Sequence, residues 1–209
     1  MTLIDNLKWR YATKVFDKTK MVPEKDLEEV IEAFRLTPSS FWLQPWKLLI
    51  IRDENKRQEL LPNSWNQSQI IDASHLLVLA RIENAWNDLV DEYLDDMCEI
   101  SGATRENLKW YEDMMKWFLA WLSPEQKSAW ADRQVMIASW IMMSLLAEKK
   151  IDSCPIEWFD KAKYNEILWL DKLWLSSVLV LPIWYRSPED KYSLRPKIRF
   201  KKEKLVIEM

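Results

Sequence analysis

The chain has 209 residues, of which 48% are hydrophobic and 30% charged, and its net charge at neutral pH is −3. This apolar content excludes a disordered chain, and the lack of any linker-like stretch predicts one domain over residues 1–209. The interspersed charges argue against nucleic acid or an anionic membrane as a partner, and two cysteines with one histidine argue against a metal centre.

The N-terminal segment lacks the basic and apolar pattern of a signal peptide, and the chain has no apolar run long enough to cross a bilayer. We therefore expect a cytoplasmic protein without a membrane partner. Near this end, Arg10 and Lys14 are four residues apart and would share one face of a helix, where they could hold a phosphate. Taken alone, such a basic pair is more often solvated surface.

The next part of the chain predicts a helix and two buried strands. From Val22 to Arg35, Pro23 suits a first turn, and apolar residues share one face. Short aliphatic runs over 47–53 and 75–82 predict strands. The loops at 37–46 and 65–75 carry hydroxyls and amides that could bind a ligand, although the second would otherwise be read as turns and helix caps.

The second half predicts further helices, one more strand and a basic end. An aromatic, Met-rich helix over 106–122 is either core or a lid over a ligand, and core is favoured because such side chains fill irregular gaps. Ser123 is predicted to cap a helix that begins at Pro124. Its residues 133–146 are apolar on nearly every face, which requires cover by neighbouring elements or a second subunit.

Residues 160–168 then predict a short helix and residues 175–185 an apolar strand. In the basic segment 195–209, Lys197 and Arg199 fall on the same side of an extended chain, an arrangement suited to a phosphate. Two cationic pairs thus lie near opposite ends of the sequence.

Five segments, taken in order, resemble the oxygen-insensitive nitroreductase family, whose members bind flavin mononucleotide (FMN). They are WRYATKVFD from Trp9, TPSSFWLQPW from Thr37, WNQSQIIDASH from Trp65, IDSCPIEWFD from Ile151 and VLPIWYRS from Val180. The resemblance covers almost the whole chain. It implies an α+β nitroreductase-like fold, with a central mixed, mostly antiparallel sheet flanked by helices, in an intertwined homodimer.

The resemblance also implies a cofactor site. The phosphate and ribityl chain of FMN would be held by Arg10, Ala12, Lys14, Lys197 and Arg199, with alanine where the family commonly has serine. The partner subunit would contribute Pro38, Ser39 and Ser40, and Trp42 of the same loop would also contact the cofactor. The isoalloxazine edge would be contacted by Asn66 and Gln69, and its face by Pro155, Ile156, Glu157 and Trp158. No catalytic side chain is assigned, because the flavin carries the hydride chemistry and Glu157 is at most a nicotinamide contact.

The implied activity is two-electron reduction of nitroaromatics, quinones or similar electron-poor small molecules, with NADH or NADPH as the donor in a ping-pong cycle. Two alternatives stay open. One is a non-catalytic or vestigial flavin-binding protein, and the other is a flavin-destroying or dehalogenating relative that shares the same motifs.

The chain has one glycine and 14 tryptophans, whereas average usage predicts roughly 15 glycines. The family pattern has or tolerates glycine at seven of these tryptophans: Trp42, Trp110, Trp117, Trp158, Trp169, Trp174 and Trp184. It fits tryptophan at Trp9, Trp46, Trp65 and Trp130. We hypothesise that the source genome reads UGA as glycine where the standard code gives tryptophan. The alternatives, deliberate substitution or drift, would place bulky indoles in turns and, at Trp158, against the nicotinamide.

Overall fold

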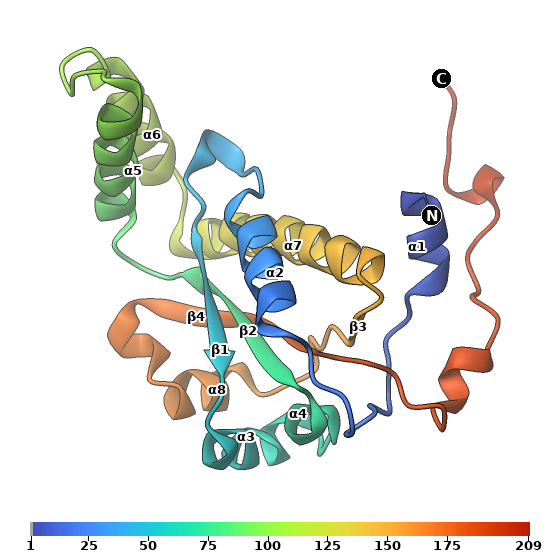
Figure 1. Cartoon of the computed structure of the whole chain (residues 1–209). Coiled ribbons are helices and arrows are strands. Elements are labelled where there is room, and N and C mark those ends of the chain that lie inside the picture. Colours follow the sequence, from blue (N-terminus) through green and yellow to red (C-terminus); the bar gives the residue numbers. More distant parts are fainter. Residues whose placement is uncertain (1) are drawn as a thin grey trace.

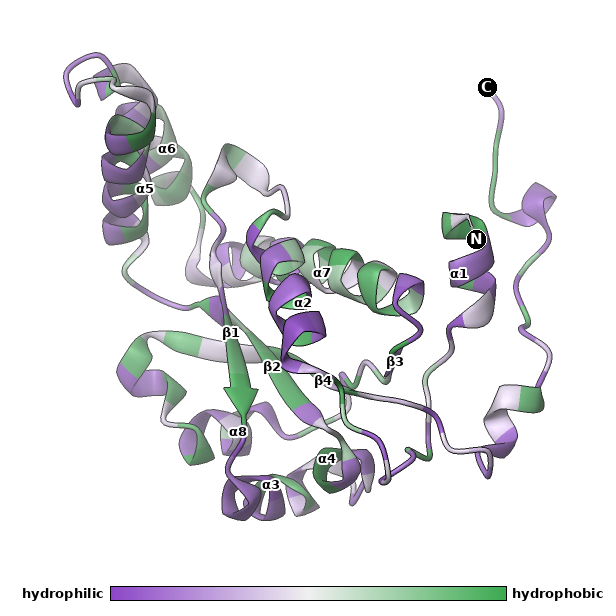
Figure 2. Cartoon of the chain, in the orientation of Figure 1, coloured by the Kyte–Doolittle hydropathy of each residue, from purple (hydrophilic) through white to green (hydrophobic). Residues whose placement is uncertain are grey.

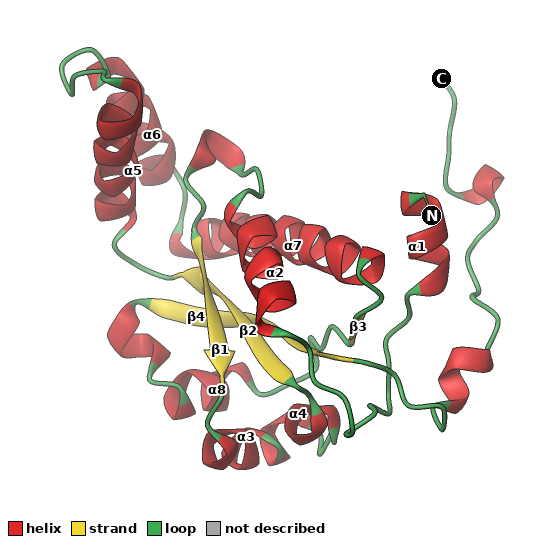
Figure 3. Cartoon of the chain, in the orientation of Figure 1, coloured by secondary structure: helices red, strands yellow, loops and turns green. Residues whose placement is uncertain are grey.

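The computed structural model describes residues 2–209. Its centre is a four-stranded sheet in the order β1-β2-β4-β3, in which each neighbouring pair is antiparallel (Figure 3). The strands are β1 (Trp46–Ile51), β2 (His75–Ile82), β3 (Asp152–Ser153) and β4 (Leu175–Trp184). A parallel contact is made by the isolated bridge between Ala12 and Ser153. The predicted strands over 47–53, 75–82 and 175–185 are confirmed.

Helices cover both faces of this sheet (Figure 1). One face packs against α2 and α7, and the opposite face against α3, α4 and α8, while α5 and α6 form a hairpin that projects from the body. The helices are α1 (Leu3–Trp9), α2 (Glu24–Arg35), α3 (Glu54–Leu60), α4 (Gln69–Asp72), α5 (Trp86–Ser101), α6 (Lys109–Trp121), α7 (Pro124–Glu148) and α8 (Lys161–Ile167).

The alternation of side chains along β2 divides the core in two. Leu76 and Val78 face the cluster formed with α3, α4, α5, α6 and α8, whereas Leu77 and Leu79 face the cluster formed with α2 and α7. All ten residues of β4 are buried. Because successive side chains of a strand point to opposite faces, β2 and β4 must be apolar throughout, and Figure 2 shows this apolar character at the centre of the molecule.

The long helix α7 begins as predicted. The Ser123 side chain accepts a hydrogen bond from the Gln126 backbone N–H, and the Gln126 side chain accepts one from the Ser123 N–H, which forms a capping box. Val135, Ala138 and Met142 are fully buried against the sheet and α2. The opposite face is uncovered within the chain, because Ile137, Trp140 and Ile141 are 42%, 53% and 41% exposed.

The expectation that Arg10 and Lys14 share a helix face is wrong. A capping box at Thr2 starts α1, and the helix ends at Trp9, so Arg10 is already extended at φ −69° and ψ 144°. The chain then runs beside the sheet, where Ala12 pairs with Ser153 and Phe16 pairs with Arg186. This long-range pairing overrides the helical spacing.

The C-terminal segment from Leu194 onward is exposed, with a single 3₁₀ turn at Lys202–Lys204, and it runs past α1 away from the body (Figure 1). Its apolar side chains Ile198, Phe200 and Ile207 are 83%, 72% and 87% exposed. None of the helices described between residues 2 and 209 combines the length and apolarity that a membrane span requires.

Candidate functional site

The extended segment that follows α1 brings the first cations of the candidate site to β3. The Thr13 backbone N–H donates to the Ser153 carbonyl at 3.4 Å, and the Thr13 hydroxyl donates to Asp152 Oδ1 at 3.1 Å. The next residue, Lys14, therefore lies beside the end of β3, and its Nζ is 3.6 Å from Cys154 Sγ. The side chain of Arg10 reaches the same thiol closely enough to affect its titration.

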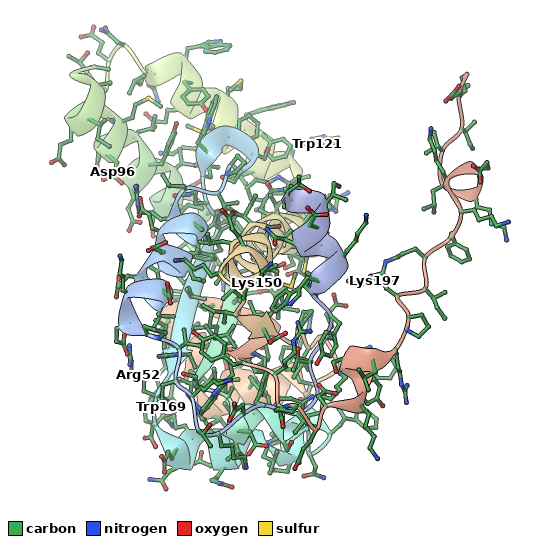
Figure 4. The ribbon with its side chains drawn as sticks, turned by 45° about the vertical axis from the view of Figure 1, so that its right-hand side comes forward. Arg52, Asp96, Trp121, Lys150, Trp169 and Lys197 are labelled. Carbon is green, nitrogen blue, oxygen red and sulfur yellow. The ribbon has the colours of Figure 1, made fainter. Side chains whose placement is uncertain are left out.

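The C-terminal segment adds two more cations from the far end of the sequence. Lys197 Nζ donates to the backbone carbonyls of Leu7, at 2.7 Å, and of Arg10. Figure 4 shows Lys197 on this segment, next to α1. Arg199 lies close enough to Arg10 for the two like charges to interact. Arg10, Lys14, Lys197 and Arg199, here called the cation cluster, are thus brought together.

The positive charges of the cation cluster are not paired in salt bridges. Among the described residues, none of its four members forms a salt bridge, and the buried Arg10 Nε has no hydrogen-bond partner. Partial desolvation and the neighbouring charges of Arg10 and Arg199 lower the pKa of Lys197. Burial and Arg199 likewise lower the pKa of Arg10. An unpartnered guanidinium nitrogen among crowded cations fits a phosphate, which accepts several charge-assisted hydrogen bonds.

Two buried carboxylates that the sequence pattern did not indicate hold this region in place. Asp190 accepts hydrogen bonds from the backbone N–H of Lys14 at 2.7 Å and of Val15 at 3.1 Å, and from the Tyr11 hydroxyl at 3.0 Å. Although burial opposes the shift, these backbone donors lower the pKa of Asp190. Burial, together with the bond to Asp190, raises the pKa of Tyr11 to about 12.

The second carboxylate is Asp152, which pairs with Arg186 at 2.7 Å and also accepts from the Arg186 backbone N–H at 2.8 Å. The Arg186 guanidinium in turn lies over the rings of Trp9 and Tyr11, at 4.1 and 4.6 Å from their centroids. The contacts that hold the site are long-range, since Asp152 and Arg186 are separated by 34 residues and Asp190 and Lys14 by 176. Asp190 also accepts from the Tyr192 N–H as the cap of a 3₁₀ turn, but this local role does not reveal its bonds to Lys14 and Val15.

Of the two residues expected at the flavin edge, one lies at the cluster. Gln69 is the buried first residue of α4, and its Nε2 is 4.0 Å from Cys154 Sγ. Cys154, which we did not predict as a site residue, therefore lies between Gln69 and Lys14, and burial raises the pKa of its thiol despite the nearby cations. Asn66 is exposed and has a left-handed backbone, with φ 54°.

The segment expected along the flavin face follows Cys154 directly. Pro155 is half-buried, whereas Ile156 pairs with Val180 and is only 3% exposed, so its side chain belongs to the core. Glu157 and Trp158 are exposed. The Trp158 ring lies 6.4 Å from that of Trp65, next to the loop that leads to Gln69.

The loop that contains Pro38, Ser39, Ser40 and Trp42 connects α2 to β1 (Figure 1) and contacts α7 and α6. The Ser40 N–H donates to Gln134 Oε1 of α7 at 2.9 Å, and the Tyr111 hydroxyl of α6 donates to the Phe41 carbonyl at 3.4 Å. Within residues 2–209 no hydrogen bond or salt bridge joins this loop to the cation cluster.

Over the same residues, no three side chains of histidine, cysteine, aspartate or glutamate are grouped in a way that could hold a metal ion.

Comparison with known proteins gives concordant results. The model of the Nitroreductase family matches residues 7–183. A protein of Staphylococcus epidermidis, named as an NAD(P)H nitroreductase, is 33% identical over 199 residues, which cover 91% of this chain and 90% of the relative. A Staphylococcus haemolyticus protein of the same name is 32% identical, with 93% of each chain covered.

Solved structures show the same fold. A nitroreductase of Bacillus subtilis superposes with a TM-score of 0.88 at 20% identity, covering 99% of this chain and 98% of the other. A nitroreductase of Exiguobacterium sibiricum, solved in complex with FMN, superposes with a TM-score of 0.86 at 18% identity. The match covers 100% of this chain and 98% of the other.

Proposed function

Because the chain belongs to the nitroreductase family, we propose that it is an FMN-dependent oxidoreductase. It takes electrons from NADH or NADPH and passes them, two at a time, to electron-poor small molecules such as nitroaromatics or quinones. The observation that carries this proposal is the cation cluster. Lys14 and Arg10 lie near Cys154, Lys197 and Arg199 lie near Arg10, and within residues 2–209 none of the four forms a salt bridge.

The side chains of this cluster fit the phosphate end of FMN. Arg10 and Lys14 come from the segment beside β3, and Lys197 and Arg199 close over them from the C-terminal segment. Arg10 Nε is a free donor for a phosphate or ribityl oxygen. Ala12 supplies only backbone at this point, because its side chain is a methyl group.

The remaining site residues would hold the ring of FMN. Gln69, buried at the start of α4, and Asn66 would offer amides to its edge, and the segment from Pro155 to Trp158 would lie along its face. When bound, FMN supplies the hydride chemistry that no side chain of this chain provides. The protein's contribution is to bind, orient and shield the reacting ring, and one site serves the electron donor and the acceptor in turn.

The site is complete only in a homodimer. Within residues 2–209 the loop with Pro38, Ser39, Ser40 and Trp42 forms no hydrogen bond or salt bridge with the cation cluster of its own chain, and it would contact the flavin of the partner subunit. The uncovered apolar face of α7 and the exposed apolar side chains of the C-terminal segment supply the surface that joins the subunits.

Absorption spectroscopy of the purified protein tests the proposal. We expect a yellow protein whose flavin absorbance bleaches when NADH or NADPH is added without oxygen and returns when a nitroaromatic or a quinone is added. A panel of acceptors with both nicotinamides then identifies the preferred pair. A chain that binds FMN but is not bleached by either donor is a non-catalytic flavin-binding protein, and this outcome contradicts the proposed activity.

A further inference from the structure

Three tryptophans occupy backbone conformations that favour glycine. Trp42, Trp169 and Trp174 have left-handed φ values of 58°, 54° and 54°. In this region the Cβ of an L-residue crowds the following carbonyl oxygen, and a bulky side chain there is an outlier. Glycine has no Cβ and adopts the same conformation without strain.

The places of these residues in the fold are typical of glycine as well. Trp169 directly follows Leu168, the C-cap of α8, and Trp174 is the left-handed cap of the 3₁₀ turn Leu170–Leu173. Glycine is the usual residue at such helix ends. The single glycine of the chain, Gly102, has this role at the end of α5, with φ 73°.

The three indoles also lie outside the core. Trp42, Trp169 and Trp174 are 64%, 60% and 57% exposed, and among the described residues none of them contacts another aromatic ring. Only Trp169 has an interaction of its ring, with the surface cations Lys56 and Lys172 at 4.4 and 5.8 Å. Figure 4 shows Trp169 at the outer edge of the molecule. A glycine at each position would therefore remove no core contact.

Other tryptophans behave as core residues. Trp46 is 4% exposed and packs against Phe34 at 5.6 Å. Trp130 is 6% exposed and meets the rings of Trp86 and Phe118, each at 6.1 Å. Trp86 Nε1 donates to the Glu83 carbonyl at 3.1 Å. The structure thus divides the tryptophans into those that pack and bond and those that do not.

Tryptophan is more frequent among the residues with positive φ than its share of the sequence would predict. Four of the nine non-glycine residues with positive φ are tryptophans, although tryptophan supplies 14 of the 209 residues. The fourth is Trp65, whose ring, unlike those of the other three, contacts a second indole. We therefore leave Trp65 outside the set.

Trp184 adds an independent observation from the core. It ends β4 and is 7% exposed, but its indole Nε1 is buried without a hydrogen-bond partner. A buried donor that has lost water and gained no acceptor destabilises the fold. Glycine at this position would remove the unsatisfied group.

We propose that the native protein carries glycine in place of Trp42, Trp169, Trp174 and Trp184, because UGA codons are read as glycine in its source, and that it carries tryptophan at Trp46, Trp86 and Trp130. This assignment concerns residue identity and does not depend on the proposed activity.

The gene and the native protein give the direct test. We expect UGA codons at the four positions and UGG codons at the three control positions. Peptides of the protein isolated from its source should be lighter, at each of the four positions, by the difference between an indolylmethyl group and hydrogen. UGG codons, or peptide masses that match tryptophan, at the four positions would overturn the assignment.

Stability of the recombinant chain gives a test that does not need the source cells. The triple variant Trp42→Gly, Trp169→Gly, Trp174→Gly should melt several degrees above the chain with tryptophan at all three, because backbone strain is relieved. The control Trp46→Gly should melt below it, because that ring fills the core. A triple variant that melts at or below the starting chain would contradict the conformational argument.

Discussion

At the scale of single residues, the cation cluster makes a prediction about cofactor affinity. Replacing Lys14 and Lys197 by alanine removes two charge-assisted hydrogen bonds to the phosphate, which together contribute about 3 kcal/mol or more, so the Kd for FMN should rise about a hundredfold. Fluorescence titration of the apoprotein with FMN measures this change.

A matched control removes the same amount of charge from near the two ends of the chain. The double variant Lys8→Ala, Lys201→Ala takes one cation from α1 and one from the C-terminal segment, outside the cation cluster, and should bind FMN nearly as well as the parent. If the Lys14 and Lys197 double variant still holds stoichiometric FMN, the phosphate is bound elsewhere.

The only histidine of the chain makes a prediction about pH. His75 is 3% exposed at the start of β2, and its Nδ1 lies 3.0 Å from the Ser74 hydroxyl. Burial lowers its pKa from the ordinary value of 6.5, against a smaller opposing effect of Glu24. The unfolded chain therefore takes up a proton at a higher pH than the folded chain does.

The free energy of unfolding should consequently be highest above pH 6.5 and decrease as the pH falls from 6.5 to the lower pKa of the folded state. Below that value both states are protonated and the loss stops. Urea unfolding across this range, for the parent and for His75→Gln, measures the effect. A variant that keeps the full pH dependence would show that another group is responsible.

At the scale of elements, the contribution of the α7 capping box to stability can be tested. Ser123→Ala removes the hydroxyl that accepts from the Gln126 N–H at 3.2 Å, and should lower the free energy of unfolding by about 1 kcal/mol. The control is Ser144→Ala. The Ser144 hydroxyl donates to the Trp140 carbonyl within the same helix, and its removal should leave the free energy of unfolding nearly unchanged. Denaturant unfolding distinguishes the two variants, and equal losses would rule out a specific capping effect.

Elements were predictable where the signal is local. The aliphatic runs identified β1, β2 and β4, and Ser123 with Pro124 identified the start of α7. The helix α5 escaped prediction, although it is amphipathic and buries Leu89, Val90 and Leu94. The helical spacing of Arg10 and Lys14 was misleading, because pairing with β3 holds that segment extended.

The site was predictable only in part, because some of its contacts join residues that are far apart in the sequence. The resemblance named Arg10, Lys14, Lys197 and Arg199, and the structure brings these four together. Asp152 and Asp190, which orient the segment, act across 34 and 176 residues. Contacts over such separations follow from the topology of the sheet, which no local pattern of residues encodes.

At the scale of the whole molecule, the exposed apolar surface of the single chain supports the proposed homodimer. Ile137, Trp140 and Ile141 leave a strip of α7 exposed at the middle of the molecule, and the C-terminal segment exposes Phe200 and Ile207 without packing them. Monomeric proteins rarely expose contiguous apolar surface of this kind. The homodimer should therefore bury more than about 2,000 Å², the range of obligate interfaces.

Charges on the exposed strip of α7 should separate the subunits and, with them, release the cofactor. In Ile137→Glu with Ile141→Glu, both carboxylates would be desolvated at the interface, which costs several kcal/mol per ion when unpaired. We expect light scattering to show monomers on dilution and the flavin absorbance to leave the protein fraction. The control Ile100→Glu, at the 86% exposed end of α5, should remain a yellow dimer. A folded monomeric double variant that still holds FMN would show that one chain suffices for the site, and the assignment of the loop at Pro38, Ser39 and Ser40 to the flavin of the partner subunit would then be wrong.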